Sequence, residues 1–135
     1  MKTYLVDTDI IIYWLRGKHP QISQKIEEID SNALRLSAIT VAELYFGAHS
    51  SSKPQENFQL LEELLAEVQV IPFDVSTAAV FGRVKTELRK SGYTISDSDI
   101  FIAATALAHG MTLVTNNEKH FGLVAGLMIE NWMKV

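Results

Sequence analysis

The strongest constraint on the fold lies at residues 4–15, where a short apolar strand leads into acidic residues and then into a longer apolar run. Residues 4–6 are few, apolar and β-favouring, whereas residues 10–15 continue the apolar run beyond the length of one buried strand. We therefore predict a strand, a turn and a buried helix. In a parallel α/β sheet such a turn lies at the carboxyl edge, where ligands usually bind, so Asp7 is a candidate site residue.

The rest of the chain repeats this alternation of strands and helices. Helical periodicity predicts helices over residues 20–30, 40–49, 54–69, 75–90 and 96–109. Short apolar segments predict strands over residues 34–38, 70–73, 111–115 and 127–130, with a polar loop at 116–118. This order indicates an α/β fold, a three-layer α/β/α sandwich with a mainly parallel sheet of four to five strands, in a single domain over residues 1–135.

The composition is that of a globular protein and excludes several classes. No apolar run approaches the ~20 residues of a membrane span. Residues 1 and 2 lead straight into the first predicted strand, so we expect no signal peptide. The absence of cysteine excludes disulfides and thiolate metal sites, and we expect a cytoplasmic location. The formal charge of −4 argues against holding nucleic acid by general basicity, although basic residues at 83–90 could form a local patch.

Helix capping is a simple structural explanation for the leading acids. Thr40-x-x-Glu43 and Ser96-x-x-Asp99 both match the capping box, in which the acid bonds back to the backbone N–H of the first residue. Asp7 could likewise cap the first helix. Taken singly, the spacing of Glu43 and Asp99 favours capping over chemistry.

The predicted topology changes this balance, because it brings the acids to one edge of the sheet. The helix that carries Asp99 precedes the strand at 111–115, so its start lies on the same edge as Asp7. Glu43 follows the second strand by one short turn, and the loop after the fourth strand adds Asn116, Asn117 and Glu118. Crowded carboxylates repel, and no buried lysine or arginine in these segments neutralises them, which predicts a bound divalent cation. Oxygen ligands select Mg²⁺ or Mn²⁺ over zinc.

Four segments together resemble the PIN-domain ribonucleases, specifically the VapC-type toxins. They are Asp7-Thr8-Asp9, residues 37–44 (SAITVAEL), residues 99–104 (DIFIAA) and residues 113–117 (LVTNN), and the similarity extends through residues 126–132. The resemblance implies a compact metal-dependent endoribonuclease that cuts RNA, usually as a homodimer. It also implies a VapB-type antitoxin, whose C-terminal segment lies in a groove over the active site.

Carried over residue by residue, the resemblance makes Asp7, Glu43 and Asp99 the three acidic metal ligands and catalytic residues. Family members commonly have an acid just before the phenylalanine of the last loop, where this chain has His120. The weaker candidates for the metal or its surroundings are therefore Asn116, Asn117, Glu118, Asp9 and Asp97. Of these, Asp9 stands where asparagine is more usual, and Asp97 is expected to help cap its helix.

Two alternative interpretations remain open from the sequence. The motif Asp7-Thr8-Asp9 also resembles the nucleophile and acid of haloacid-dehalogenase-type phosphatases. In such an enzyme Glu43 would have no role, and this sequence has no lysine at the end of a predicted strand. The second alternative is a catalytically degenerate PIN module that binds RNA or protein, and the unclear fourth ligand motivates it. Motifs of zinc proteases, serine hydrolases and phosphate-binding glycine loops are absent from the sequence.

Overall fold

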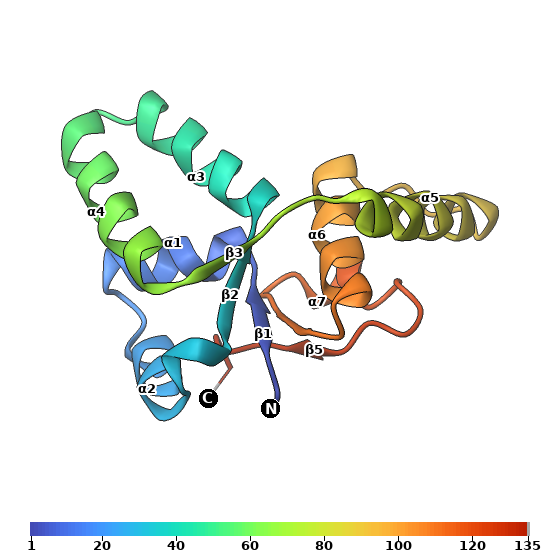
Figure 1. Ribbon diagram of the computed structural model, residues 1–135, viewed down its shortest axis with the longest axis horizontal. Helices are drawn as coiled ribbons and strands as arrows, with labels where there is room; N and C mark the ends of the chain where they lie inside the picture. The colour runs from blue at the N-terminus through green and yellow to red at the C-terminus, as the bar shows by residue number, and fades with distance from the viewer. Residues whose placement is uncertain (135) are drawn as a thin grey trace.

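The computed structural model, which describes residues 1–134, contains a five-stranded sheet flanked by helices (Figure 1). The strands are β1 (Tyr4–Val6), β2 (Leu34–Ser37), β3 (Gln69–Ile71), β4 (Thr112–Val114) and β5 (Ile129–Glu130). Their order in the sheet is β3-β2-β1-β4-β5, and every pairing between neighbours is parallel. The predicted three-layer α/β/α fold with a parallel sheet is confirmed.

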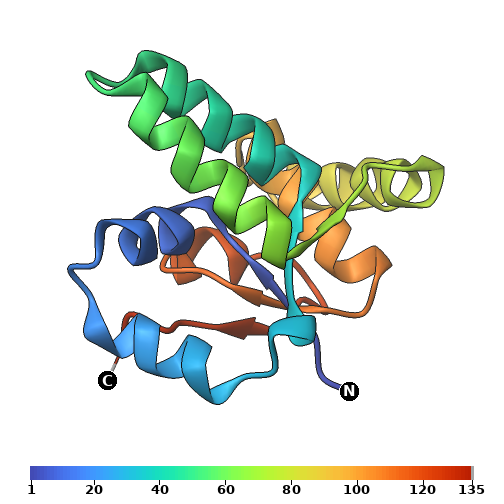
Figure 2. The ribbon, with the colours of Figure 1, turned by 60° about the vertical axis from the view of Figure 1, so that its left-hand side comes forward.

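The helices form two outer layers on the faces of the sheet. They are α1 (Thr8–Arg16), α2 (Pro20–Glu28), α3 (Ala38–Ser50), α4 (Pro54–Glu67), α5 (Val75–Lys90), α6 (Asp97–Ala108) and α7 (Glu118–Phe121), with a 3-10 turn η1 (Ser31–Ala33) before β2. Successive strand side chains point to opposite faces. In β1, Leu5 therefore packs with Val84 of α5, whereas Val6 packs with Ile10 of α1 and Leu61 of α4. The ribbon views show α3 and α4 on one side and α5 and α6 on the other (Figures 1 and 2).

Several boundaries differ from the predictions for local chemical reasons. Helix α3 begins at Ala38 rather than at residue 40, because Ser37 caps it: the Ser37 Oγ accepts a hydrogen bond from the Thr40 N–H at 3.0 Å. Strand β3 ends at Ile71, just before Pro72, which has no N–H to donate to a sheet. The loop predicted at residues 116–118 is wrong at its end, since α7 begins at Glu118.

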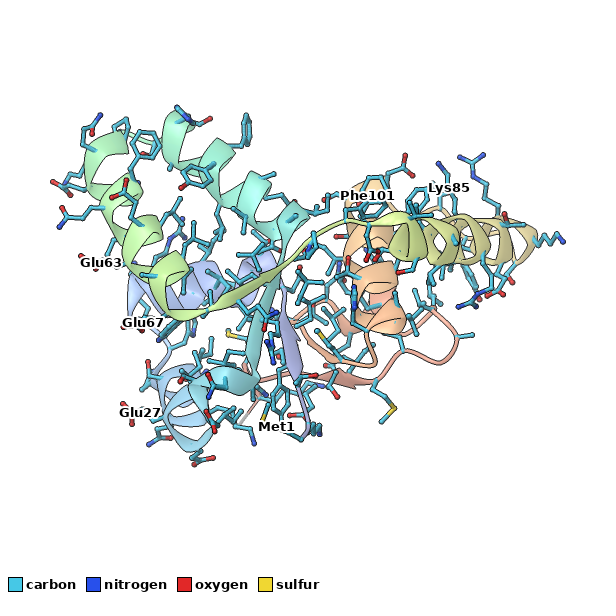
Figure 3. All side chains as sticks on the ribbon, viewed as in Figure 1. Met1, Glu27, Glu63, Glu67, Lys85 and Phe101 are labelled. Carbon is cyan, nitrogen blue, oxygen red and sulfur yellow. The ribbon has the colours of Figure 1, made fainter. Side chains whose placement is uncertain are left out.

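The outer faces of the helices carry charged side chains that are exposed to solvent. Glu27 of α2 and both Glu63 and Glu67 of α4 are exposed and point outward (Figure 3). On the opposite layer, the Lys85 Nζ lies 5.7 Å from the centre of the Phe81 ring. Within residues 1–134, no helix is long and apolar enough to cross a membrane.

Candidate active site at the carboxyl edge of the sheet

Asp7 occupies the position directly after β1 and is held by contacts from three directions. Its backbone N–H donates to the Val114 carbonyl of β4 at 2.8 Å, which extends the pairing of the two strands. Its side chain caps α1 by accepting from the Thr8 N–H at 2.8 Å, and the Thr115 hydroxyl donates to its other oxygen, also at 2.8 Å. Only 6% of the residue is exposed. The predicted capping role is thus confirmed, and the carboxyl is also buried.

Burial makes the ionised form of this carboxyl costly. It raises the pKa of Asp7 to about 7, and the charge of Asp9 adds to the rise, while the hydrogen bonds from Thr115 and Thr8 oppose it. Burial also raises the pKa of Asp9, against hydrogen bonds from the Ile10 and Asn116 backbone and from the Asp7 carboxyl. The two acids therefore share one poorly solvated site, in which two full negative charges repel each other.

Glu43 does not form the predicted capping box. Because Ser37 caps α3, Glu43 lies in the second turn of the helix, and its carboxylate is free to reach other segments. Its Oε1 accepts from the Thr8 hydroxyl at 2.6 Å, and its Oε2 accepts from the Ser98 hydroxyl at 3.1 Å. The capping prediction for Glu43 is wrong, and the residue instead joins α1, α3 and α6 at the edge of the sheet.

Asp99 faces the same edge from the first turn of α6. Its N–H donates to the Ser96 Oγ at 3.2 Å, which confirms Ser96 as the cap of this helix. Burial raises the pKa of the Asp99 carboxyl, the hydrogen bond with Ser96 opposes this, and the charge of Glu43 raises it further. Asp97, in contrast, is the first residue of the helix rather than its cap, and it pairs with the Lys85 Nζ at 2.8 Å. The predicted capping role of Asp97 is therefore wrong.

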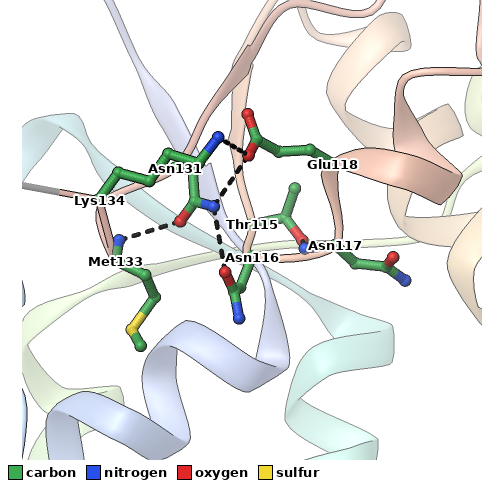
Figure 4. Close-up of polar contacts among 7 residues, drawn as sticks. All are labelled: Thr115, Asn116, Asn117, Glu118, Asn131, Met133 and Lys134. Atoms are coloured by element: carbon green, nitrogen blue, oxygen red, sulfur yellow. Dashed lines mark hydrogen bonds and ion pairs between the residues drawn. The ribbon is translucent and has the colours of Figure 1, made fainter.

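The candidates in the loop after β4 are engaged elsewhere (Figure 4). The Glu118 Oε2 accepts from the Lys134 Nζ at 2.6 Å and from the Asn131 Nδ2 at 3.1 Å, and the same Nδ2 donates to the Asn116 Oδ1 at 3.1 Å. Hydrogen bonding to Lys134 lowers the pKa of Glu118. The Asn117 Nδ2 lies 3.1 Å from the Nδ1 of His120. The structure thus turns Asn116 and Glu118 toward the C-terminal segment.

Sequence reasoning missed the hydroxyls that orient the acids. Thr8, Ser98 and Thr115 each donate to a carboxylate of the site. Each stands next to an acid or at the end of a strand in the sequence, which is the only local signal that could have pointed to them. Such hydroxyls fix the direction of a carboxylate without neutralising its charge.

The chemistry of the donors fits a hard divalent cation. Across the described part of the chain, no lysine or arginine pairs with Asp7, Asp9, Glu43 or Asp99. In the same residues, no group of three histidine, aspartate or glutamate side chains is arranged to hold an ion. Mg²⁺ usually keeps several waters and takes only one or two carboxylates directly, so acids that repel one another at one edge, with Asp7 buried and the others more exposed, suit it.

The fold and the position of the acids agree with a comparison against family models. Residues 4–127 match the model described as PIN domain. The chain therefore belongs to the PIN-domain family, as the resemblance indicated. The phosphatase interpretation, for which Asp97 and Asp99 could have served as late metal ligands, loses its basis, because the matching family model is that of the PIN domain.

Within this family, the chain is similar in sequence to proteins named VapC. It is 38% identical over 133 residues to Ribonuclease VapC2 of Haemophilus influenzae, covering 98% of this chain and 100% of that protein. It is 29% identical over 132 residues to the tRNA(fMet)-specific endonuclease VapC of Shigella flexneri, covering 98% and 99%.

Solved structures agree with these relatives. The matched chain of VapBC2 from Rickettsia felis, bound to a DNA fragment from the promoter, superposes with a TM-score of 0.90 and 32% identity, over 96% of this chain and 98% of that one. DNA-bound VapBC of Salmonella typhimurium gives a TM-score of 0.92 and 30% identity, over 98% of this chain and 99% of that one.

Proposed function

We propose that this protein is a metal-dependent endoribonuclease, the toxin of a VapBC-type pair. The observation that carries the proposal is the convergence of Asp7, Glu43 and Asp99 at one edge of the sheet, from three separate segments and without a cationic partner. The names of the relatives, which are ribonucleases and endonucleases, support the same activity. Because one of these names specifies tRNA(fMet), transfer RNA is the first substrate class to test.

Asp7, Glu43 and Asp99 would hold the metal, and the ion would be Mg²⁺ or Mn²⁺. When bound, such an ion lowers the pKa of a water and offsets charge that develops on a phosphodiester. The protein's own part is to hold the carboxylates in place. The Thr115 hydroxyl orients Asp7, while the hydroxyls of Thr8 and Ser98 orient Glu43.

The test is cleavage of RNA by purified protein with Mg²⁺ controlled. Asp99→Asn keeps the shape of the side chain but removes its charge, so it should leave folding intact and abolish metal-dependent cleavage. Asp97→Asn is a matched control two residues away, because Asp97 pairs with Lys85 outside the acid cluster. Full activity of Asp99→Asn would contradict the assignment.

The partner we propose is a VapB-type antitoxin whose C-terminal segment enters a groove beside the site. The groove has a volume of about 220 Å³ and lies between α1, α3 and α4. Its lining is mainly apolar and includes Ile12, Leu44 and Leu61, while Glu43 lies at its edge and so links it to the acids. The solved relatives are complexes of both components, VapB and VapC. We also expect a homodimer, which light scattering of the purified protein would measure.

A degenerate PIN module remains the second candidate, because no three acidic or histidine side chains within residues 1–134 surround a single point. Calorimetric titration with Mg²⁺ separates the two functions. Heat of binding together with cleavage supports the enzyme. A protein that neither binds metal nor cuts RNA would be the binding module.

A further inference from the structure

One amide side chain of the C-terminal segment, that of Asn131, contacts two residues that follow β4. The Asn131 Nδ2 donates to both the Asn116 Oδ1 and the Glu118 Oε2, each at 3.1 Å (Figure 4). The Asn131 Oδ1 accepts from the Met133 N–H at 2.9 Å. An amide group has two N–H donors, and here both are directed at the same loop. Asn131 therefore bridges two residues of the loop while it remains fixed to its own segment.

The segment that carries Asn131 is itself anchored to the body of the protein. Trp132 is only 4% exposed, and its ring lies 5.4 Å from that of Tyr4 in β1. The Gln21 side chain of α2 donates to the Met133 carbonyl at 3.1 Å. Contacts to two distant elements make the segment a firm support, so a hydrogen bond from Asn131 can hold the loop in one place.

The opposite side of this loop reaches Asp7 and Asp9, the two acids that follow β1. The Thr115 hydroxyl donates to Asp7 at 2.8 Å and accepts from the Asn117 N–H at 3.0 Å. The backbone of Asn116 lies near enough to the Asp9 carboxylate to oppose the rise of its pKa. The loop thus orients both acids after β1, and its own position depends on the contacts at Asn116 and Glu118.

We propose that Asn131 is a positioning residue for the active site, acting through Asn116 and Glu118 on the loop that orients Asp7 and Asp9. The proposal rests on the ribonuclease function proposed above. It gives Glu118 the task of accepting hydrogen bonds from Asn131 and Lys134 rather than of binding metal. Residues that orient metal ligands in this way typically contribute about 10- to 100-fold to activity or metal affinity.

The experiment compares Asn131→Asp, Glu118→Gln and the double variant. Asn131→Asp keeps the acceptor for the Met133 N–H but replaces both donors and places a charge beside Glu118. We expect its kcat for RNA to fall about 10-fold or more, with KM unchanged. Glu118→Gln retains an acceptor for Asn131 but loses the ion pair with Lys134, so its kcat is measured as the reference for the double variant. In the double variant the amide introduced at position 118 donates to the carboxylate introduced at position 131 and the charge repulsion is removed, so kcat should rise above that of Asn131→Asp; it should stay below that of Glu118→Gln, because the Asn116 Oδ1 still lacks its donor.

Asn32→Asp is the matched control, because it makes the same change of charge at a distant place. Asn32 lies before β2, at the opposite edge of the sheet. Wild-type cleavage that is lost in Asp99→Asn establishes the ribonuclease function independently of Asn131. With that in place, an unchanged kcat in Asn131→Asp would overturn the positioning role. A loss of kcat in Asn131→Asp that adding Glu118→Gln does not relieve would also overturn it. A lower Mg²⁺ affinity of the Glu118→Gln single variant in calorimetry would overturn it as well, because Glu118 would then be a metal ligand.

Discussion

At the scale of single residues, the site is defined by charges that are oriented but not neutralised. Asp7 is almost fully buried beside Asp9, and its partners are a hydroxyl and a backbone N–H rather than a cation. Burying a carboxylate in this way costs free energy unless a positive charge arrives. Without metal, the protein therefore carries an electrostatic cost that a bound ion would relieve.

Stability as a function of pH should reveal this cost. A carboxyl whose pKa is raised in the folded state binds more protons folded than unfolded between about pH 4 and pH 7, so stability falls as pH rises through that window. Asp7→Asn should be more stable than the wild type by roughly 1–3 kcal/mol at pH 8 in EDTA, and the difference should shrink toward pH 4. Urea denaturation at several pH values measures it, and equal pH dependence of the two proteins would contradict the burial argument.

Asp9 should affect the pH range of cleavage more than its maximum. Its charge is one cause of the raised pKa of Asp7, after burial. Asp9→Asn should therefore lower the apparent pKa of the acid limb in the rate profile and only attenuate the maximum rate, whereas Asp7→Asn should abolish cleavage. Rates of RNA cleavage between pH 5 and 9 test both variants. An acid limb that does not move in Asp9→Asn would show that this charge does not act on Asp7.

At the scale of elements, one capping residue decides what Glu43 can do. Because Ser37 caps α3, the helix starts before Thr40, and Glu43 is released to meet Thr8 and Ser98. The same helix forms one wall of the apolar groove through Leu44. Helix α3 thus connects the acid cluster to the proposed antitoxin site.

A substitution in the groove should separate inhibition from catalysis. Leu60 of α4 lines the groove and is 41% exposed, so glutamate at this position is tolerated by the fold but places a charge in an apolar site. Leu60→Glu should weaken binding of the proposed VapB-type antitoxin about 10-fold or more and leave RNA cleavage unchanged. Calorimetry and the cleavage assay measure the two effects. Glu56→Gln, on an exposed position of α4, is a control.

At the scale of the whole molecule, the sequence predicted the architecture better than the polar contacts. The parallel sheet and the common edge of Asp7 and Asp99 follow from the alternation of strands and helices, because a helix that precedes a strand must begin at the carboxyl edge. The cap of α3 was missed, since Thr40-x-x-Glu43 matches the capping box, whereas the true cap, Ser37, is followed three residues later by a threonine and does not match it. The pairing of Glu118 with Lys134 joins distant positions through tertiary structure, which no local pattern encodes.

Metal binding, protonation and folding should be linked across the whole protein. Below about pH 7 the carboxyl of Asp7 holds a proton that a cation must displace, so binding releases protons and weakens as pH falls. Calorimetric titration of Mg²⁺ at pH 6.5, in two buffers of different ionisation enthalpy, should detect this release, and at pH 8.5 it should nearly vanish. Bound ion adds RT ln(1 + [L]/Kd) to stability, about 2.7 kcal/mol at 100 times Kd, so melting temperature should rise more at pH 8.5 than at pH 6.5. Asp7→Asn removes the titrating group, and proton release that persists in this variant would assign the linkage to another carboxyl.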